Sequence, residues 1–403
     1  MKFAKDIVLN ILSQMMFIAV QQAILFPAFE KQLGQGSFGW FILIYGVFNV
    51  FVVTIATSFT NLYQKRFNSF IREFEYRTAY YSYYKWIIIY FCLISVISSI
   101  AIVVTKMTAI EYILLAVLII LTASRMFLMV WYRVRKQFLI ILFVNLGLSI
   151  LYASLYLLNI ENVIQILVSF IIIEFIINIV IYLLNKINIK NMLNARIGTF
   201  EFNSLNFLML SGFAASLMNY SDRFIINLLL GASNVTVYYI ATLPTKLMLF
   251  PFNMMSSVIL SYIASTDNIT KTMKKKVLMA IPFIFLLVSA ISYFAGLLVI
   301  QILYPQYLNA IKDIYFIVTL TFGFICIDNI IRSFLLKYYS LAKKGILDAT
   351  TLVIFVLLSI IFTDLESDLT SIAIAQFTVF LLKVIVEIYI FCKLDYGKID
   401  DKL

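Results

Sequence analysis

Apolar runs of about 20 residues recur along the whole chain, and a run of that length crosses a bilayer as one helix. Of the 403 residues, 63% are apolar and 13% are charged. Soluble domains carry about a quarter charged residues. We therefore expect an all-α polytopic membrane protein with twelve transmembrane helices, at residues 8–29, 38–60, 83–104, 109–131, 138–158, 163–184, 203–230, 236–263, 277–300, 311–335, 346–363 and 369–392.

The basic residues between these runs lie almost entirely on one side of the predicted membrane. With the amino terminus inside, the inside segments hold 23 of the 31 basic residues. The outside segments hold three: Lys31, Lys106 and Lys312. Because cytoplasmic loops are enriched in Lys and Arg, both termini are predicted to be cytoplasmic.

A polar, basic stretch at 185–201 divides the twelve runs into two sets of six. Each set has a Leu-Gly pair at the end of its first run, Leu33-Gly34 and Leu230-Gly231. Six spans return a chain to the side where it began, so we expect two six-helix lobes related by a parallel pseudo-repeat. These lobes are 1–190 and 198–403, joined by a cytoplasmic linker at 185–201. Glycine is common after the last residue of any helix, so the two Leu-Gly pairs could also occur by chance in a chain without a repeat.

Several kinds of chemistry are excluded by composition. The chain has no histidine, which removes histidine-based metal sites, catalytic triads and proton relays. Cys92, Cys326 and Cys392 are far apart in or beside apolar runs, where cysteine is a small packing residue. No nucleotide-binding motif occurs, and no metal or cofactor is expected. The net charge of +11 comes mainly from loops predicted to lie beside the membrane, so we do not expect the protein to bind nucleic acid.

Charged residues inside apolar runs are costly, at roughly 2.5–3.5 kcal/mol each at the centre of a span. Asp328 and Arg332 are four residues apart in one run, and Lys383 and Glu387 in another. Residues at that spacing share a helix face, so we expect each pair to neutralise itself locally.

Five other intramembrane charges have no opposite charge at that spacing: Arg125, Glu174, Asp222, Arg223 and Lys246. Asp222 and Arg223 are adjacent, so their side chains diverge by about 100° around the helix. All five need partners on other helices, in water or in a substrate. Interhelical ion pairs that fix the bundle explain them as well as a transport site does.

Three short motifs resemble those of bacterial polysaccharide-unit flippases of the Wzx type, in the multidrug/oligosaccharidyl-lipid/polysaccharide exporter superfamily. They lie at the end of the first helix, in the seventh helix and before the tenth, and comprise Pro27, Lys31, Leu33-Gly34 and Phe38-Gly39; Asp222-Arg223, Leu230-Gly231 and Tyr238; and Leu303-Tyr304-Pro305-Gln306-Tyr307 with Ala310. The chain departs from the family at Lys31, where Arg is usual, and at Thr57-Ser58-Phe59, where a glycine is common.

The resemblance implies a two-lobed carrier in the bacterial inner membrane rather than an enzyme with catalytic residues. Such a carrier moves undecaprenyl-diphosphate-linked oligosaccharide units from the inner to the outer leaflet by alternating access. Its product serves biosynthesis of O-antigen lipopolysaccharide or capsule. Its implied partners are the lipid-linked substrate, the bilayer, H⁺ or Na⁺ as coupling ion, and the polysaccharide polymerase machinery.

Fixed cations in a cavity would lower the barrier for such a diphosphate headgroup, and Arg binds phosphate through two parallel hydrogen bonds. Arg125, Arg223 and Lys246 are the candidate cavity cations. Glu174 and Asp222 are the candidate coupling acids, which would exchange a basic partner for a proton or Na⁺.

A polar face of the first run adds three further candidates. Asn10, Gln14 and Gln21 lie within about 40° of one another on a helix. They could line the cavity and meet sugar hydroxyls, or serve polar packing between helices.

Two other functions fit a chain of this length and hydropathy. A drug or cation exporter of the same superfamily would favour acids in its cavity, whereas cations outnumber acids here by three to two. A membrane-embedded polymerase or ligase would carry its reactive groups in a large external loop, and no loop between the predicted spans is long enough.

Overall fold

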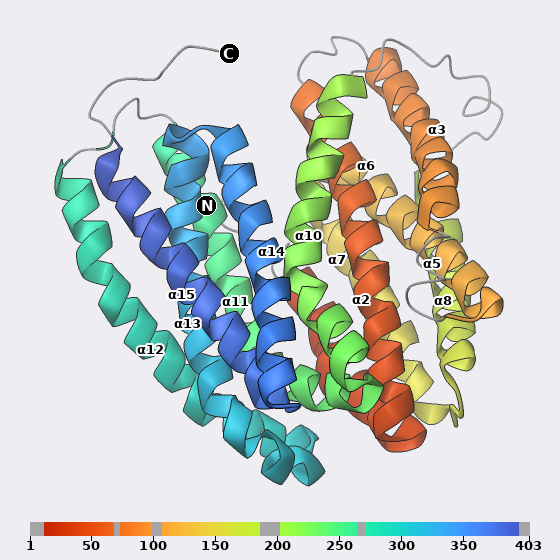
Figure 1. The fold of residues 1–403 in the computed structure, drawn as a ribbon. Helices are drawn as coiled ribbons and strands as arrows, with labels where there is room; N and C mark the ends of the chain where they lie inside the picture. Colours follow the sequence, from red (N-terminus) through yellow and green to blue (C-terminus); the bar gives the residue numbers. More distant parts are fainter. Residues whose placement is uncertain are drawn as a thin grey trace. The chain divides into compact units, whose positions relative to one another are not determined.

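The computed structural model describes residues 12–67, 73–98, 107–185, 202–264, 269 and 271–394. Every regular element in these ranges is helical. The elements up to residue 230 are a helical stretch at 12–19, η1 (Val20–Leu25, a π-helix), α2 (Phe26–Phe67), α3 (Glu73–Ser98), α5 (Ala109–Leu128), α6 (Val130–Val134), α7 (Phe138–Ser154), η2 (Leu155–Leu157), α8 (Val163–Leu184) and α10 (Phe202–Leu230). The rest are α11 (Ala232–Ala264), α12 (Lys271–Leu303), η3 (Pro305–Tyr307), α13 (Leu308–Tyr338), α14 (Leu341–Leu365) and α15 (Leu369–Lys393) (Figure 1).

Eight helical segments of the described ranges are long and apolar enough to cross a membrane. This supports the predicted polytopic class, while the count of twelve spans stays a prediction. Most predicted spans coincide with helices to within a few residues, and α8 has the predicted bounds. The third span was predicted to begin at residue 83, whereas α3 begins at Glu73. Hydropathy marks only the apolar part of a helix, and the polar and tyrosine-rich residues before 83 continue this one.

Both Leu-Gly pairs form turns with a left-handed glycine. Gly34 has φ 75° and ψ 168° and interrupts the 53-residue segment Leu12–Gln64. Gly231 has φ 87° and separates α10 from α11. Its N–H bonds to the carbonyls of Ile226 and Asn227, which is a common way to end a helix. The turn after Gly231 is shorter than predicted, because α11 begins at Ala232.

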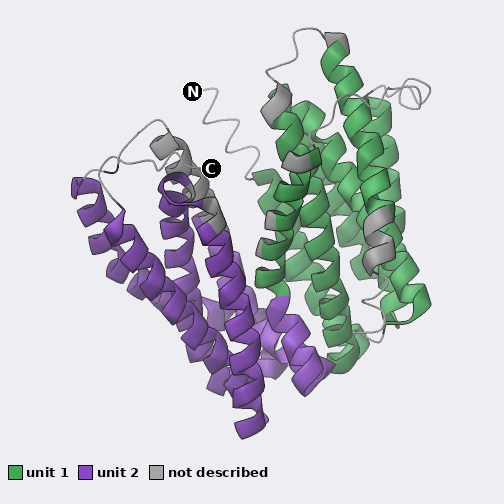
Figure 2. Cartoon of the chain, turned by 45° about the horizontal axis from the view of Figure 1, so that its top comes forward, with its two compact units in different colours: residues 1–220 green, residues 221–403 purple. Residues whose placement is uncertain are grey.

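The chain separates into two compact units, residues 1–220 and 221–403 (Figure 2). The division falls inside α10, later in the chain than the predicted linker at 185–201. Apart from Asn185, that linker lies outside the described residues, and the predicted lobes with their pseudo-repeat stay a prediction.

In unit 1, α5 packs against α2, α3 and α8, and α7 packs against α8. Aromatic rings fill the contact between the first turns of α2 and the rest of the unit. Phe26 meets Phe41 edge-on at 5.4 Å between ring centroids, and Phe41 lies 6.2 Å from Phe170 of α8. These large rings connect α2 with α8.

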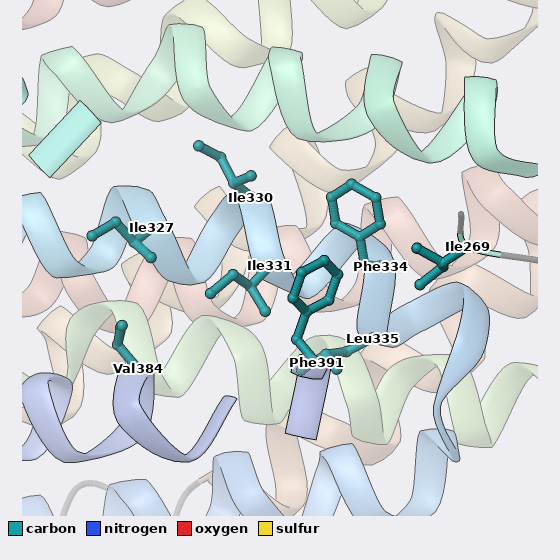
Figure 3. Packing of buried hydrophobic residues seen from close by; sticks show 8 residues of the cluster. All are labelled: Ile269, Ile327, Ile330, Ile331, Phe334, Leu335, Val384 and Phe391. Atoms are coloured by element: carbon teal, nitrogen blue, oxygen red, sulfur yellow. The ribbon is translucent and has the colours of Figure 1, made fainter. Parts of the chain in front are cut away.

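In unit 2, α13 is the central helix and packs against α11, α12, α14 and α15. The contact of α13 with α12 uses small residues: a Cβ on Gly323 would lie 2.6 Å from Ser289 Oγ. Tyr315 of α13 also donates a hydrogen bond to the Ser292 carbonyl, at 2.7 Å. At the other end of α13, a buried apolar cluster joins it to α15 and to the residue before α12; its members are Ile269, Ile327, Ile330, Ile331, Phe334, Leu335, Val384 and Phe391 (Figure 3).

Candidate functional site: buried ionic groups

Arg125 of α5 and Glu174 of α8 form a two-pronged ion pair inside unit 1. Arg125 Nε lies 2.7 Å from Glu174 Oε2, and Arg125 Nη2 lies 3.1 Å from Glu174 Oε1. Both residues are buried. The expected partner on another helix is therefore found, and it is one of the two candidate coupling acids.

Aromatic residues surround this pair. The Tyr152 hydroxyl lies 3.4 Å from Glu174 Oε1, and the Arg125 guanidinium lies 5.9 Å from the centre of the Phe17 ring. Phe17 packs edge-on against Tyr152. Both oxygens of Glu174 thus accept hydrogen bonds, and a proton or cation bound to Glu174 would compete with Arg125 for them.

The predicted polar face of the first run is described in part. Gln21 is buried and accepts a hydrogen bond from the Tyr45 hydroxyl at 3.0 Å, in keeping with polar packing between helices. Gln14 is partly buried, and Asn10 lies outside the described residues. Gln21 also lies within the π-helix η1. Helices of this type are rare in proteins, and those that occur are often found at functional sites.

In unit 2, Asp222 of α10 pairs with Lys246 of α11. Lys246 Nζ lies 2.8 Å from Asp222 Oδ2, and Asp222 Oδ1 accepts the backbone N–H of Arg223 at 2.9 Å. The Arg223 guanidinium lies 5.5 Å from the centre of the Tyr239 ring. Lys246 retains 26% exposure of its side chain, against 3% for Asp222. Among the contacts described here, two cations, Arg223 and Lys246, lie beside one buried acid, Asp222.

A second charged group in unit 2 differs from the prediction. Asp328 Oδ2 bonds to Lys383 of α15 at 3.1 Å, and Glu387 Oε1 bonds to Lys344 of α14 at 2.7 Å. Asp348 of α14 joins both lysines, at 2.6 Å from Lys344 Nζ and 3.0 Å from Lys383 Nζ. The group therefore links α13, α14 and α15 through two lysines and three carboxylates.

The predicted local pairs, Asp328 with Arg332 and Lys383 with Glu387, do not form ion pairs within the described residues. Each of these acids turns to a lysine of a neighbouring helix, because a buried side chain pairs with the opposite charge that packing brings to it. Two carboxylate oxygens, Asp328 Oδ1 and Glu387 Oε2, are buried and accept no hydrogen bond from the described part of the chain. The group thus has more acceptor atoms than donors.

Lys344 and Asp348 were missed as site residues. Lys344 was counted among the loop cations, yet its side chain is only 3% exposed. The sequence predicts a span from residue 346, whereas α14 begins at Leu341. Lys344 and Asp348 are four residues apart, the spacing at which two side chains share a helix face, and this spacing is the sequence signal for the pair.

No protein-family model matches the sequence, and no curated protein matches it. Solved structures do match over nearly the whole chain. The lipid II flippase MurJ, in an inward closed conformation, has a TM-score of 0.62 at 14% identity, covering 94% of this chain and 87% of that one. A MATE protein in complex with MaL6 has a TM-score of 0.63 at 15% identity, covering 96% and 95%. An inward-facing multidrug resistance MATE transporter of the MOP superfamily has a TM-score of 0.61 at 12% identity, covering 96% and 95%.

The chain has the fold of these transporters. At such low identity the likeness concerns the fold alone. Together with the apolar helices it supports a multi-pass membrane protein, and the matched proteins are a flippase and MATE proteins rather than enzymes. It does not separate a polysaccharide-unit flippase from a drug exporter.

Proposed function

We propose that this protein is a flippase for lipid-linked oligosaccharide diphosphates in the bacterial inner membrane. The observation that carries the proposal is the group of Asp222, Arg223 and Lys246, where two cations meet one acid. A charged diphosphate needs fixed positive charge to cross an apolar slab, and this group offers it. The fold shared with a lipid II flippase and the sequence motifs support the same assignment.

Lys246 is the cation that meets the substrate in this proposal. Its side chain is the more exposed partner of the pair, and an ammonium bound to one carboxylate oxygen retains further hydrogen-bond donors. Binding of a phosphate oxygen at Lys246 Nζ would weaken its hold on Asp222. Asp222 would then become available to H⁺ or Na⁺, which couples substrate movement to an ion gradient.

Arg125 and Glu174 have a different place in the proposal. Because Glu174 holds Arg125 through two hydrogen bonds, Arg125 can reach a phosphate only when Glu174 takes up a proton or a sodium ion. Unit 1 would therefore bind substrate only in one of its ionic states.

Substrate transport is tested by deleting the gene and complementing it with variants. We expect deletion to strand lipid-linked repeat units on the inner leaflet and the unaltered protein to restore export. Lys246→Gln should export roughly tenfold to a hundredfold less efficiently at normal membrane abundance, since a charge-assisted hydrogen bond is worth about 1.5–3 kcal/mol. Lys275→Gln, which changes an exposed lysine of α12, serves as the matched control.

The drug-exporter alternative rests on the MATE neighbours, which match as well as the flippase does. It is tested in the same strains by following efflux of a cationic dye. If deletion abolishes dye efflux and leaves lipid-linked glycans unchanged, the flippase assignment is wrong. If unpolymerised units instead appear outside the membrane, the protein acts in polymerisation.

The predicted orientation is checked separately. Reporter fusions after Lys275 and Lys402 should report the cytoplasm, and fusions at Lys106 and Ser367 the exterior, as the distribution of basic residues requires. An exterior signal at Lys275 would overturn the span count.

A further inference from the structure

Asp328 of α13 and Glu387 of α15 each have one carboxylate oxygen that is bonded to a lysine and one that is not. Asp328 Oδ2 accepts a hydrogen bond from Lys383 at 3.1 Å, and Glu387 Oε1 accepts one from Lys344 at 2.7 Å. The second oxygens, Asp328 Oδ1 and Glu387 Oε2, are buried without a donor from the described residues. A buried acceptor without a donor costs free energy, and more so when it is charged. Each acid therefore needs one further donor.

The two acids lie within hydrogen-bonding reach of each other. Two ionised carboxylates can only accept hydrogen bonds, so they repel at this distance. A protonated carboxyl group has one O–H that can donate. A single proton would therefore supply the missing donor and remove the repulsion between Asp328 and Glu387.

The charged groups beside this pair lie on the same three helices, α13, α14 and α15; they are Arg332, Lys344, Asp348 and Lys383. The two lysines also bond to Asp348, at 2.6 and 3.0 Å, so three acids share their positive charge. Lys344 Nζ lies 3.9 Å from Asp328 Oδ1, which is beyond hydrogen-bond distance. The lysines therefore do not satisfy the second oxygens.

More distant cations do not satisfy them either. Arg332 attracts Asp328 but forms no ion pair with it in the described part of the chain. The other helices packed against α13 are α11 and α12. Their charged residues are Lys246, which bonds to Asp222, and the lysines between residues 271 and 276. Neither helix gives Asp328 Oδ1 or Glu387 Oε2 a donor from its described residues.

A proton fits this place better than a metal ion does. A metal cation such as Ca²⁺ requires six or more oxygen ligands. Among the described residues, no three acids are placed to hold a metal ion, and two ammonium groups beside the pair would repel one. A proton needs only the two facing carboxyl groups. Ile331, one turn after Asp328, and Val384, one turn before Glu387, belong to the buried apolar cluster of Figure 3.

We propose that Asp328 and Glu387 hold one proton between them and that this proton joins α13 to α15. One of the two second oxygens carries the proton, and the other accepts its hydrogen bond. The proton stays bound as part of the fold and is not the ion that crosses the membrane, for which Asp222 and Glu174 are the candidates. The proposal therefore goes beyond the proposed function.

Infrared spectroscopy of the full-length protein in lipid nanodiscs detects the proton, because the carbonyl band of a protonated carboxyl group is separate from that of a carboxylate. Difference spectra between the unaltered protein and each variant at neutral pH cancel the contributions of the other acids. We expect Glu387→Gln to lose one protonated band, and Asp328→Asn to lose the same band to the same extent. The double variant should lose no more, because one proton serves both groups.

Glu387→Gln leaves the contacts of this residue in place. Its amide oxygen can accept from Lys344, and its amide N–H can donate to Asp328 as the bound proton does. Asp313→Asn, which changes an exposed acid of α13, is the matched control and should leave the protonated band unchanged. Membrane abundance of each variant shows whether it is inserted.

Thermal stability as a function of pH gives a second readout. The proton stabilises the fold while it is bound, and this stabilisation is lost as the pH rises and the proton leaves. The unaltered protein should therefore lose stability over the pH range in which its infrared band disappears. Glu387→Gln should keep its stability over that range relative to the unaltered protein, because its amide donates at any pH.

Four results would overturn the proposal. The first is the absence of a protonated band from the difference spectra of both single variants. The second is a double variant that loses twice the band of either single variant, which would mean two separate protons. The third is loss of the band from the unaltered protein when Na⁺ is added at constant pH, which would identify a cation site. The fourth is failure of Glu387→Gln to insert, because its amide supplies the same donor. None of these outcomes requires an export assay, so the shared proton and the flippase assignment can fail independently.

Discussion

The two units each have a Leu-Gly turn with a positive-φ glycine, and they differ in the composition of their buried ion-paired groups. Gly34 in unit 1 and Gly231 in unit 2 adopt similar left-handed φ values of 75° and 87°. The ion-paired group described in unit 1 has one acid and one base, Glu174 and Arg125, joined by two hydrogen bonds. Unit 2 has two such groups, and in neither do the bonded acids and bases described above match in number.

This difference indicates which buried groups would be stabilised most by binding an ion or a charged substrate. A balanced pair in an apolar interior resists change, because removing either partner leaves a buried charge uncompensated. An unbalanced group can lower its free energy by taking up a proton, a cation or an anion. In the contacts described above, two bases lie beside Asp222, whereas three carboxylates share the two lysines Lys344 and Lys383.

The largest effect is expected at Lys344, whose Nζ lies within 4 Å of all three carboxylates of the second group. Lys344→Met should leave Glu387 without its only lysine partner among the described residues and cost at least about 3–5 kcal/mol. We expect little correctly inserted protein, measured as membrane abundance and as thermal stability after extraction in detergent. Lys343→Met, which changes the exposed neighbouring lysine, is the control. Normal abundance of Lys344→Met would show that the three acids do not depend on this lysine.

Arg125→Ala tests the balanced pair and should cost about 3–5 kcal/mol, because it leaves Glu174 buried without its base. Replacing both residues, as in Arg125→Leu/Glu174→Leu, should recover most of the lost abundance. Export by this double variant then distinguishes the two interpretations of the pair. Normal export would assign Arg125 and Glu174 to the structure alone, and absent export at normal abundance would assign them to transport.

A smaller and equal effect is expected at the two glycines that the units share. Neither has a neighbouring atom within 4 Å of an added Cβ, so the cost of alanine comes from backbone strain alone. Gly34→Ala and Gly231→Ala should each lower stability by about 1–2 kcal/mol. Thermal unfolding of the two variants measures this. A large difference between them would mean that the two turns differ in their structural role, although both glycines have positive φ.

The smallest effect is expected at Glu387, where loss of one acid equalises the second group at two lysines and two carboxylates. Glu387→Gln should change stability by less than about 1 kcal/mol, or raise it, although the residue is fully buried. Glu174→Gln is the matched comparison in unit 1 and should destabilise, because it unbalances a balanced pair. Equal losses in the two variants would contradict the proposed difference between the units.

The helices could be predicted from the sequence because their signal is local. Apolar runs set the bounds of most helices to within a few residues, and Leu-Gly marked both left-handed turns. The sequence also indicated that Arg125, Glu174, Asp222 and Lys246 need partners on other helices, since none has an opposite charge at i±3 or i±4.

The identity of the partners could not be predicted, because it depends on how neighbouring helices are rotated and placed along their axes. Asp328 has Arg332 one turn away on its own helix and still bonds to Lys383, 55 residues further along the chain. Lys344 was assigned to a loop because it precedes the apolar run, although it lies inside the helix. A charged side chain at the end of an apolar run can therefore be buried.

The π-helix η1 has a mechanical consequence for the first helix. A π turn accommodates one residue more than an α turn, so moving or removing it shifts the helical register by one residue, a rotation of about 100° and an advance of about 1.5 Å. Residues before it, such as Phe17, would swing away from Arg125, while Phe26 and Phe29 stayed packed. Such a register shift would change what the Arg125–Glu174 pair contacts and would leave the helical backbone hydrogen-bonded.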